Sequence, residues 1–272
     1  MKCYYHNDAD GRCAGAIVCH YYNFSHAMKF IEVEYKDEIN VDDIEKDERI
    51  YIVDFSFKPE VMEKILLKTN EIVWIDHHKT AMEYKYSQPI RGTRSNQYSG
   101  CELTWLWFYP DIEMPWAIKF IGDRDTWTWH YEESAYFNLG LMLKQHQPED
   151  TIWIDLFNNR YYKSMIKYGK ICKIFRDNFC NDYATSYGFE TTFEAQKCFA
   201  MGLYMFGSEA FGDRIDTYDM LISFEFVGDK WIVGLYSKKV DVSVICKAYG
   251  GGGHTGAGGF TCDVLPFKKE II

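Results

Sequence analysis

Short apolar runs alternate with helix-type segments over the first 80 residues, and this alternation restricts the fold more than any other feature of the sequence. Runs typical of buried strands occur at Lys2–Tyr5, Ala27–Glu34, Ile50–Asp54 and Glu71–Ile75. Gly11–Tyr22 and Pro59–Asn70 lie between them with apolar residues at helical spacing, and the second begins with a proline at a favoured first-turn position. Strands that alternate with helices predict right-handed crossovers, and hence a mostly parallel sheet of an α/β protein.

Acidic and histidine side chains follow three of these predicted strands. In parallel sheets the ligand site lies beyond the carboxyl ends of the strands, so these side chains are expected to converge at one edge. The converging set is His6, Asp8, Asp10, Asp54, Asp76, His77 and His78. Any one of these aspartates, taken alone, is more simply a turn former or a helix cap.

Carboxylates and imidazoles gathered in this way can bind two divalent cations, with one carboxylate between them. Such a pair activates a water molecule and clamps phosphate oxygens, which favours phosphoester hydrolysis. The mixture of nitrogen and oxygen ligands suits Mn²⁺, Fe²⁺ or Co²⁺ better than Mg²⁺, and the absence of cysteine ligands argues against structural zinc. The HNDADG segment lacks the later glutamate of an EF-hand, so a calcium loop is disfavoured.

The amino-acid composition restricts the kinds of partner that the chain can bind. The net charge of −10 argues against a protein that holds long nucleic acid through phosphate contacts, and favours a small anionic substrate. The nine cysteines form no CxxC pair, which predicts reduced thiols in a cytoplasmic protein. No apolar run reaches the length of a transmembrane helix or resembles a signal peptide, so no membrane association is expected.

Beyond the first four strands, the sequence predicts a helical region and then a strand-rich region. Basic residues at 91–100 precede two predicted helices, Cys101–Tyr109 and Pro115–Ile121. Residues 150–183 have a helical character, and strand-type patterns follow from Cys198, with a hairpin turn at Gly228-Asp229. We therefore expect a catalytic domain at 1–149, a helical connector at 150–185 and a smaller mixed α/β domain at 186–272.

Five motifs in this order resemble those of one known family. HNDADG, VDFS, DHH and GDRD are similar to the four motifs of the DHH phosphoesterases, and GGGGHTGAGGF is similar to the glycine-rich signature of their DHH-associated C-terminal domain. The resemblance extends from about Lys2 to Phe260. It implies a parallel-sheet DHH domain joined to a smaller substrate-binding domain.

The resemblance also implies roles for individual residues. One metal would be held by His6, Asp8 and Asp54. The second would be held by Asp10, Asp54, His77 and the aspartate of the fourth motif, for which Asp123 is favoured and Asp125 is the alternative. Asp76 would orient the neighbouring histidines, and His78 would lie against the scissile phosphate.

Substrate binding is expected from both parts of the chain. The resemblance implies contacts from Gly251, Gly252, Gly253, His254, Ser237, Lys238 and Arg94. Glycines let backbone N–H groups approach an anion closely. Many relatives carry an arginine beside the serine that corresponds to Ser237, where this chain has Lys238 and Lys239. A lysine cannot form a planar bidentate clamp, so an altered substrate choice is expected.

The sequence therefore predicts a manganese-dependent phosphodiesterase that uses two metal ions, with Mg²⁺ or Co²⁺ as substitutes, and cleaves short oligonucleotides or linear or cyclic dinucleotides to mononucleotides. Three alternatives remain: a single-strand exonuclease, a pyrophosphatase or polyphosphatase, and a non-catalytic nucleotide sensor. No stable complex with long nucleic acid is expected, and formation of a homodimer is left open.

Overall fold

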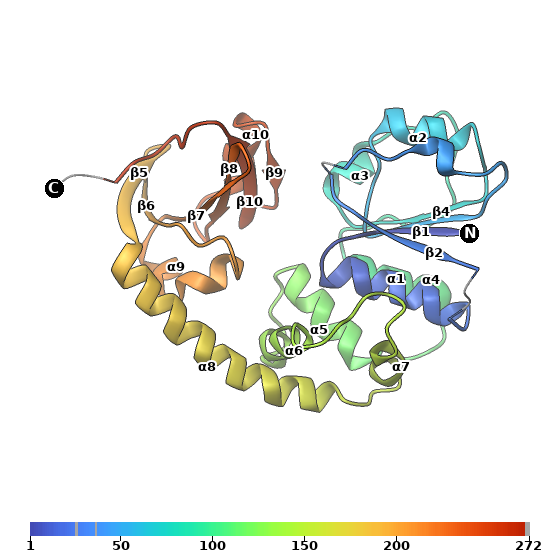
Figure 1. The fold of residues 1–272 in the computed structure, drawn as a ribbon, viewed down its shortest axis with the longest axis horizontal. Coiled ribbons are helices and arrows are strands. Elements are labelled where there is room, and N and C mark those ends of the chain that lie inside the picture. Colours follow the sequence, from blue (N-terminus) through green and yellow to red (C-terminus); the bar gives the residue numbers. More distant parts are fainter. Residues whose placement is uncertain (25–26, 36, 270–272) are drawn as a thin grey trace. The chain divides into compact units, whose positions relative to one another are not determined.

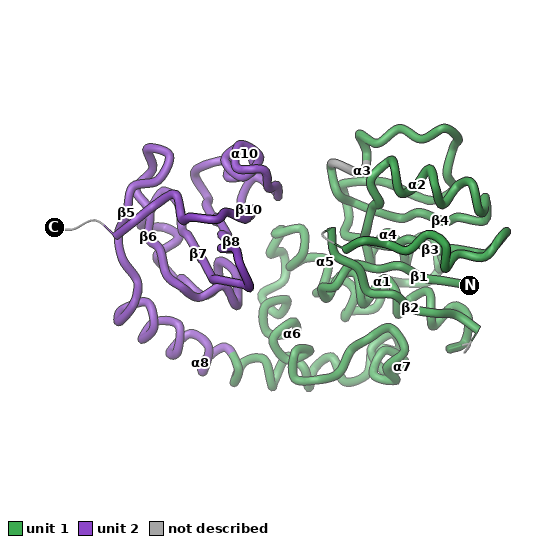
Figure 2. The backbone as a smooth tube through the Cα atoms, turned by 45° about the horizontal axis from the view of Figure 1, so that its top comes forward, with its two compact units in different colours: residues 1–172 green, residues 173–272 purple. Residues whose placement is uncertain are grey.

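The computed structural model describes residues 1–24, 27–35 and 37–269 of the chain. Two compact units, Met1–Cys172 and Lys173–Ile272, divide within the long helix α8 (Tyr162–Tyr187), as Figure 2 shows. The segment predicted as a separate connector contains α7 (Ile152–Phe157) and α8, and α7 belongs to the first unit.

The first unit is built on a four-stranded parallel sheet. Its strands are β1 (Lys2–His6), β2 (Lys29–Val33), β3 (Ile50–Val53) and β4 (Ile72–Ile75). They lie in the order β2-β1-β3-β4, and all neighbours pair in parallel. The α/β class and the parallel sheet predicted from the alternating pattern are thus confirmed.

Helices cover both faces of this sheet. Helix α2 (Pro59–Leu66) lies on one face, and α1 (Ala9–Tyr21) and α4 (Gly100–Phe108) lie on the other (Figure 1). Because successive strand residues point to opposite faces, Ile52 packs in the cluster of α2, whereas Val53 packs in the cluster of α1. Burial on both faces explains why β3 and β4 are continuous apolar runs, whereas β2 is partly exposed and carries Lys29 and Glu32.

The remaining helices of the first unit are α3 (Lys79–Glu83), α5 (Trp116–Asp125) and α6 (Glu133–Leu141), and a 3₁₀ turn covers Val41–Asp43. The sequence did not predict α6. Helix α5 is longer than predicted, so that residues 123 and 125 lie within its last turn rather than in a loop. Within the described ranges, no helix has both the length and the apolar character needed to cross a membrane.

The second unit contains a mixed six-stranded sheet in the order β5-β6-β7-β8-β10-β9. The strands are β5 (Phe189–Phe193), β6 (Gln196–Met201), β7 (Met220–Val227), β8 (Lys230–Tyr236), β9 (Gly252–Gly253) and β10 (Ala257–Cys262). Strands β7 and β8 form the predicted hairpin, with Gly228 at a φ of 68°. A 3₁₀ turn (Gly207–Phe211) and helices α9 (Arg214–Thr217) and α10 (Val242–Ala248) complete the unit.

Candidate metal centre

Asp54 follows the last residue of β3 and is 1 % exposed. Its φ of 52° lies in the left-handed region, which is uncommon for residues with a side chain but is adopted by aspartate more often than by most. Neither carboxylate oxygen of Asp54 has a hydrogen-bond partner among the described residues. A buried carboxylate without such partners is energetically costly, so Asp54 is expected to have another partner, such as a cation.

Two histidines after β4 contact one oxygen of Asp54. His77 Nε2 lies 3.2 Å from Asp54 Oδ1, and His78 Nδ1 lies 4.0 Å from the same oxygen. Asp76 precedes them and is fully buried, and its Oδ1 accepts hydrogen bonds from the backbone N–H of His77 and from Nδ1 of His78. Ser56 Oγ donates to the other oxygen of Asp76 at 2.6 Å. These contacts fix the turn that carries both histidines.

The other oxygen of Asp54 faces the loop after β1. His6 Nδ1 lies 3.9 Å from Asp54 Oδ2 and 2.8 Å from Asp8 Oδ2. Asp8 also caps α1, because its Oδ1 accepts from the backbone N–H of Gly11. A side chain at Gly11 would overlap the backbone of His6, so a glycine is required where the helix begins.

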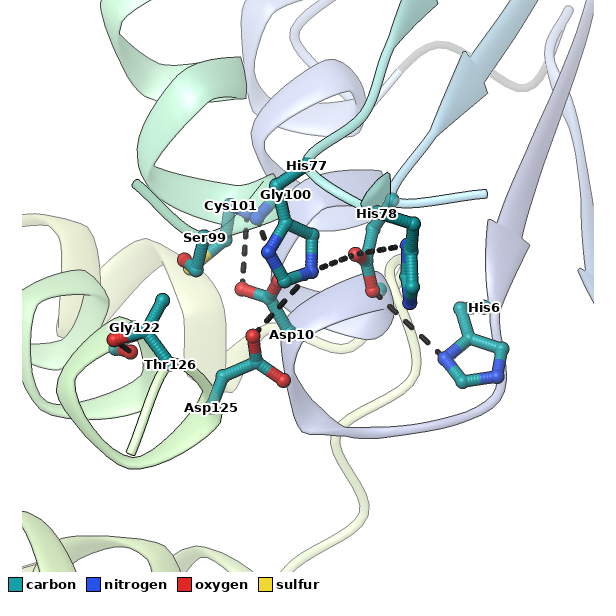
Figure 3. Close-up of polar contacts among 12 residues, drawn as sticks. His6, Asp10, His77, His78, Ser99, Gly100, Cys101, Gly122, Asp125 and Thr126 are labelled. Carbon is teal, nitrogen blue, oxygen red and sulfur yellow. Dashed lines mark hydrogen bonds and ion pairs between the residues drawn. The ribbon is translucent and has the colours of Figure 1, made fainter. Parts of the chain in front are cut away.

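Asp10 is buried in the first turn of α1 and points at the beginning of α4. Its two oxygens accept hydrogen bonds from the backbone N–H groups of Gly100 (2.6 Å) and Cys101 (3.0 Å). Helix N-termini favour negative charge, so α4 holds this carboxylate in place. Asp10 Oδ2 lies 3.8 Å from His77 Nε2, and Figure 3 shows Asp10 beside the His77 ring.

The expectation that Asp123 joins the cluster is wrong. Its carboxylate accepts hydrogen bonds from the backbone N–H groups of His130 and Tyr131 and from Ser134 Oγ. Asp125 instead lies in the cluster, with Oδ2 3.4 Å from His77 Nε2 (Figure 3). Both residues are in α5. Residues two positions apart in a helix point in directions that differ by about 200° around its axis, so only one of them can face the histidines.

Three groups of side chains could therefore each hold a cation. In every group the ligand atoms lie within 4.8 Å of one another. The groups are Asp54, His77 and His78; His6, Asp8 and Asp54; and Asp10, His77 and Asp125. Asp54 and His77 each belong to two groups, so the groups adjoin one another.

The electrostatics of the cluster favour a cation. Burial, reinforced by the charges of Asp10 and Asp8, raises the pKa of Asp54 and of Asp125 well above the usual range of an aspartate. Burial also lowers the pKa of His77, which favours the neutral imidazole that binds metals. A divalent cation would relieve the repulsion between the carboxylates and would satisfy the oxygens of Asp54 and the buried Oδ2 of Asp125, which lack hydrogen-bond partners among the described residues. The donor set thus fits the predicted metals.

The structure gives two of the predicted substrate-binding residues other contacts. Arg94 donates to the carbonyl groups of Trp74 and Ile90, and its guanidinium lies 4.8 Å from the centre of the Trp74 ring. Ser237 is buried and donates to the carbonyl of Asp219, while it accepts from two backbone N–H groups of the following turn. Both residues serve local structure, which the sequence alone did not indicate.

The other predicted substrate-binding residues lie in the second unit. Lys238 is exposed and pairs with Asp216 at 2.7 Å. His254 lies in the turn between β9 and β10, where its backbone N–H donates to the carbonyl of Ala257. Gly251 packs closely on β10, since a Cβ there would lie 2.0 Å from the carbonyl oxygen of Gly259. A Cβ at Gly252 would instead enter open space.

The sequence interpretation missed the beginning of α4. Ser99 caps this helix in a reciprocal capping box with Glu102, and Gly100 is its first residue. A serine followed three residues later by a glutamate before an apolar run is a known signature of a helix N-terminus, and it would have located the backbone groups that bind Asp10.

No family model matches the chain. A curated relative, an uncharacterized protein R106 of Acanthamoeba polyphaga mimivirus, is 27 % identical over an alignment of 273 positions, and the alignment covers 89 % of this chain and 59 % of the relative. The chain therefore spans about three-fifths of the length of that protein.

Solved structures share the fold across both units. The exonuclease RecJ bound to manganese matches 96 % of this chain and 85 % of its own, with 12 % identity and a TM-score of 0.54. A pGpG-specific phosphodiesterase, PggH, of Vibrio cholerae matches 96 % of this chain and 92 % of its own, with 12 % identity and a TM-score of 0.52. The predicted resemblance to DHH-family phosphoesterases is thus confirmed at the level of the fold.

Proposed function

We propose that the chain is a metal-dependent phosphodiesterase that hydrolyses short oligonucleotides or dinucleotides. The observation that carries this proposal is the carboxylate of Asp54, which is buried without hydrogen-bond partners among the described residues and is shared by two adjoining ligand groups. An acidic, histidine-rich centre at the carboxyl edge of a parallel sheet supports phosphoester chemistry.

The residues divide into those that hold cations and those that position other groups. His6, Asp8, Asp10, Asp54, His77 and Asp125 would hold two divalent cations. When bound, such cations neutralise charge on the phosphoryl oxygens and make water more acidic. We assign Mn²⁺ first, because imidazole and carboxylate ligands together suit it better than Mg²⁺.

We assign His78 to the substrate and not to a cation. Its Nδ1 lies 2.8 Å from Asp76 Oδ1, which fixes the orientation of the ring. We assign the other ring nitrogen, Nε2, the role of a hydrogen-bond donor to a phosphoryl oxygen of the substrate. Asp76 is then a positioning residue, since its oxygens are engaged by Ser56 and by the turn at residues 77–78.

The net charge and the glycine-rich segment of the second unit support a short substrate. A net charge of −10 disfavours a long polyanion, whose binding depends on many basic contacts. The open space at Gly252 would let a substrate approach the backbone closely. A short substrate, which needs few basic contacts, suits the acidic charge of the chain.

A product assay tests the proposal. The purified chain is stripped with a chelator and then assayed with Mn²⁺, Co²⁺ or Mg²⁺ against a dinucleotide, a five-residue RNA, a cyclic dinucleotide, long single-stranded DNA and pyrophosphate. We expect metal-dependent release of mononucleotides from the shortest substrates, and none from the Asp54→Asn variant.

Other outcomes separate the alternatives. Preferential cleavage of long DNA would support an exonuclease, and cleavage of pyrophosphate alone would support a pyrophosphatase. Binding of metal and dinucleotide without turnover would support a nucleotide sensor. Each of these three results would contradict the proposed activity.

A further inference from the structure

A pocket of about 500 Å³ lies in the first unit at the beginnings of β3 and β4, away from the metal centre. Arg49 immediately precedes β3, and Glu71 immediately precedes β4. Tyr21, Tyr22, Tyr51, Arg91, Trp107 and Phe108 also line the pocket. Its volume is in the range of sites for small molecules and cofactors.

The pocket and the metal centre lie at opposite edges of the same sheet. Asp54 follows β3 directly, whereas Arg49 precedes it, so five residue steps of strand separate them. At about 3.3 Å per residue this corresponds to roughly 16 Å. The amino ends of parallel strands share one edge and their carboxyl ends share the other, so the pocket does not belong to the metal centre.

Aromatic rings form one wall of the pocket. The ring centre of Tyr21 lies 4.6 Å from that of Phe108 and 5.2 Å from that of Tyr22. Tyr51, which is buried, lies 5.8 Å from Phe108. Tyr21 is nevertheless 48 % exposed, so part of its surface remains accessible to a ligand. A planar ligand would pack on this wall by the stacking that aromatic rings favour.

Two guanidinium groups provide positive charge at the same pocket. Arg49 Nη2 lies 3.1 Å from Glu71 Oε2, and the Arg91 guanidinium lies 5.4 Å from the centre of the Trp107 ring. A guanidinium carries five N–H donors in a planar fork, more than one carboxylate can accept. Two arginines and one glutamate leave a net positive charge at this pocket of an acidic protein.

We propose that this pocket is a second ligand site, which binds a phosphate group attached to a planar aromatic body, as in a nucleoside monophosphate. Arg49 and Arg91 contact the phosphate, because planar guanidinium groups bind phosphate in a bidentate manner. The wall of Tyr21 and Phe108 contacts the aromatic body. Inorganic phosphate would leave the wall without contacts, and a neutral nucleoside would leave the arginines without an anion.

Calorimetry on the full-length chain tests the proposal, with chelator present and in the Asp54→Asn background so that the metal centre takes no part. The probes are AMP, inorganic phosphate and adenosine. We expect AMP to bind about ten-fold or more tightly than either fragment. Because the metal centre is disabled, this result is independent of whether the proposed hydrolysis is correct.

Variants locate the site. Arg49→Gln and Arg91→Gln should each weaken AMP binding about ten-fold, the typical effect of losing a hydrogen bond to a charged group. The matched control is Arg160→Gln, which removes the same charge from an exposed arginine paired with Asp155, and it should leave the affinity unchanged. Tyr21→Phe should retain binding, whereas Tyr21→Leu should weaken it.

Four results would overturn the proposal. These are the absence of AMP binding, equal affinity for AMP and inorganic phosphate, unchanged binding in the Arg49→Gln/Arg91→Gln double variant, and equal binding by Tyr21→Leu and Tyr21→Phe. Circular dichroism of each variant checks that the chain is folded, so that a loss of binding reports on the pocket.

Discussion

Gly100 lies directly against Asp54: a Cβ atom at position 100 would be 2.4 Å from Asp54 Cβ and 2.6 Å from Asp54 Oδ1. The backbone N–H of the same glycine donates to Asp10. The beginning of α4 therefore contacts two carboxylates of the candidate metal centre, and it can do so only because residue 100 has no side chain.

The substitution Gly100→Ala should displace Asp54 or α4. We expect a loss of stability of about 1–3 kcal/mol, the usual cost of overpacking a core, together with weaker metal binding. Chemical denaturation and metal titration measure the two effects. Gly202→Ala is the control, because a Cβ there would make only ordinary contact at 3.4 Å with Phe224. Wild-type metal affinity in Gly100→Ala would show that the close approach is unimportant.

Asp123 and Asp125 provide a matched pair within one helix. Asp125→Asn should abolish metal-dependent hydrolysis and lower metal affinity, while the stability of the metal-free protein is retained or increased, because a buried charge is removed. Asp123→Asn should reduce stability by about 1–3 kcal/mol, since its carboxylate binds the loop at 130–134. Denaturation and metal titration of both variants show which aspartate binds metal and which one stabilises the fold. The opposite pattern would restore Asp123 as the ligand.

Two neighbouring glycines test the role of the glycine-rich segment. Gly251→Ala should destabilise the second unit, because its Cβ would lie 2.0 Å from a carbonyl oxygen of β10. Gly252→Ala should fold normally, since its Cβ enters open space, and should raise KM while leaving kcat within about two-fold if substrate approaches this backbone. Steady-state kinetics provide the measurement. An unchanged KM for Gly252→Ala would argue against a substrate contact at this residue.

Glu102 should make stability depend on pH. Burial, reinforced by the charge of Asp10, raises the pKa of Glu102 to about 7 in the folded protein, above the value of 4.5 for an unperturbed glutamate. Between these values the folded state binds more protons than the unfolded state, so this group lowers stability as the pH rises from about 4.5 to about 7.

The comparison of the wild type with Glu102→Gln isolates this effect. The amide oxygen of glutamine can still accept from the backbone N–H of Ser99, as Glu102 Oε2 does at 2.9 Å. We expect Glu102→Gln to gain stability relative to the wild type by up to about 3 kcal/mol between pH 5 and pH 8. Urea denaturation with chelator present measures the difference. Parallel pH profiles would show that Glu102 ionises normally.

Much of the first unit could be predicted from local patterns. The four runs became β1 to β4, and β3 and β4 are apolar throughout because they are buried on both faces, whereas β2 is partly exposed. Asp54 and Asp76 follow β3 and β4 as expected. Helix α6 was missed, although Phe137 and Leu141 are buried along it. Strand β5 was missed as well, and it is short and partly exposed.

The sequence by itself determined which side chains reach the carboxyl edge of the sheet, because parallel strands carry the residues that follow them to one side. Only the tertiary structure shows that Asp125, and not Asp123, lies beside His77, since the orientation of a helical side chain depends on how the whole helix packs. It also gave Arg94 and Ser237 local hydrogen-bond partners. Sequence patterns specify the type and order of the elements, whereas the contacts of a polar side chain depend on residues far away in the chain.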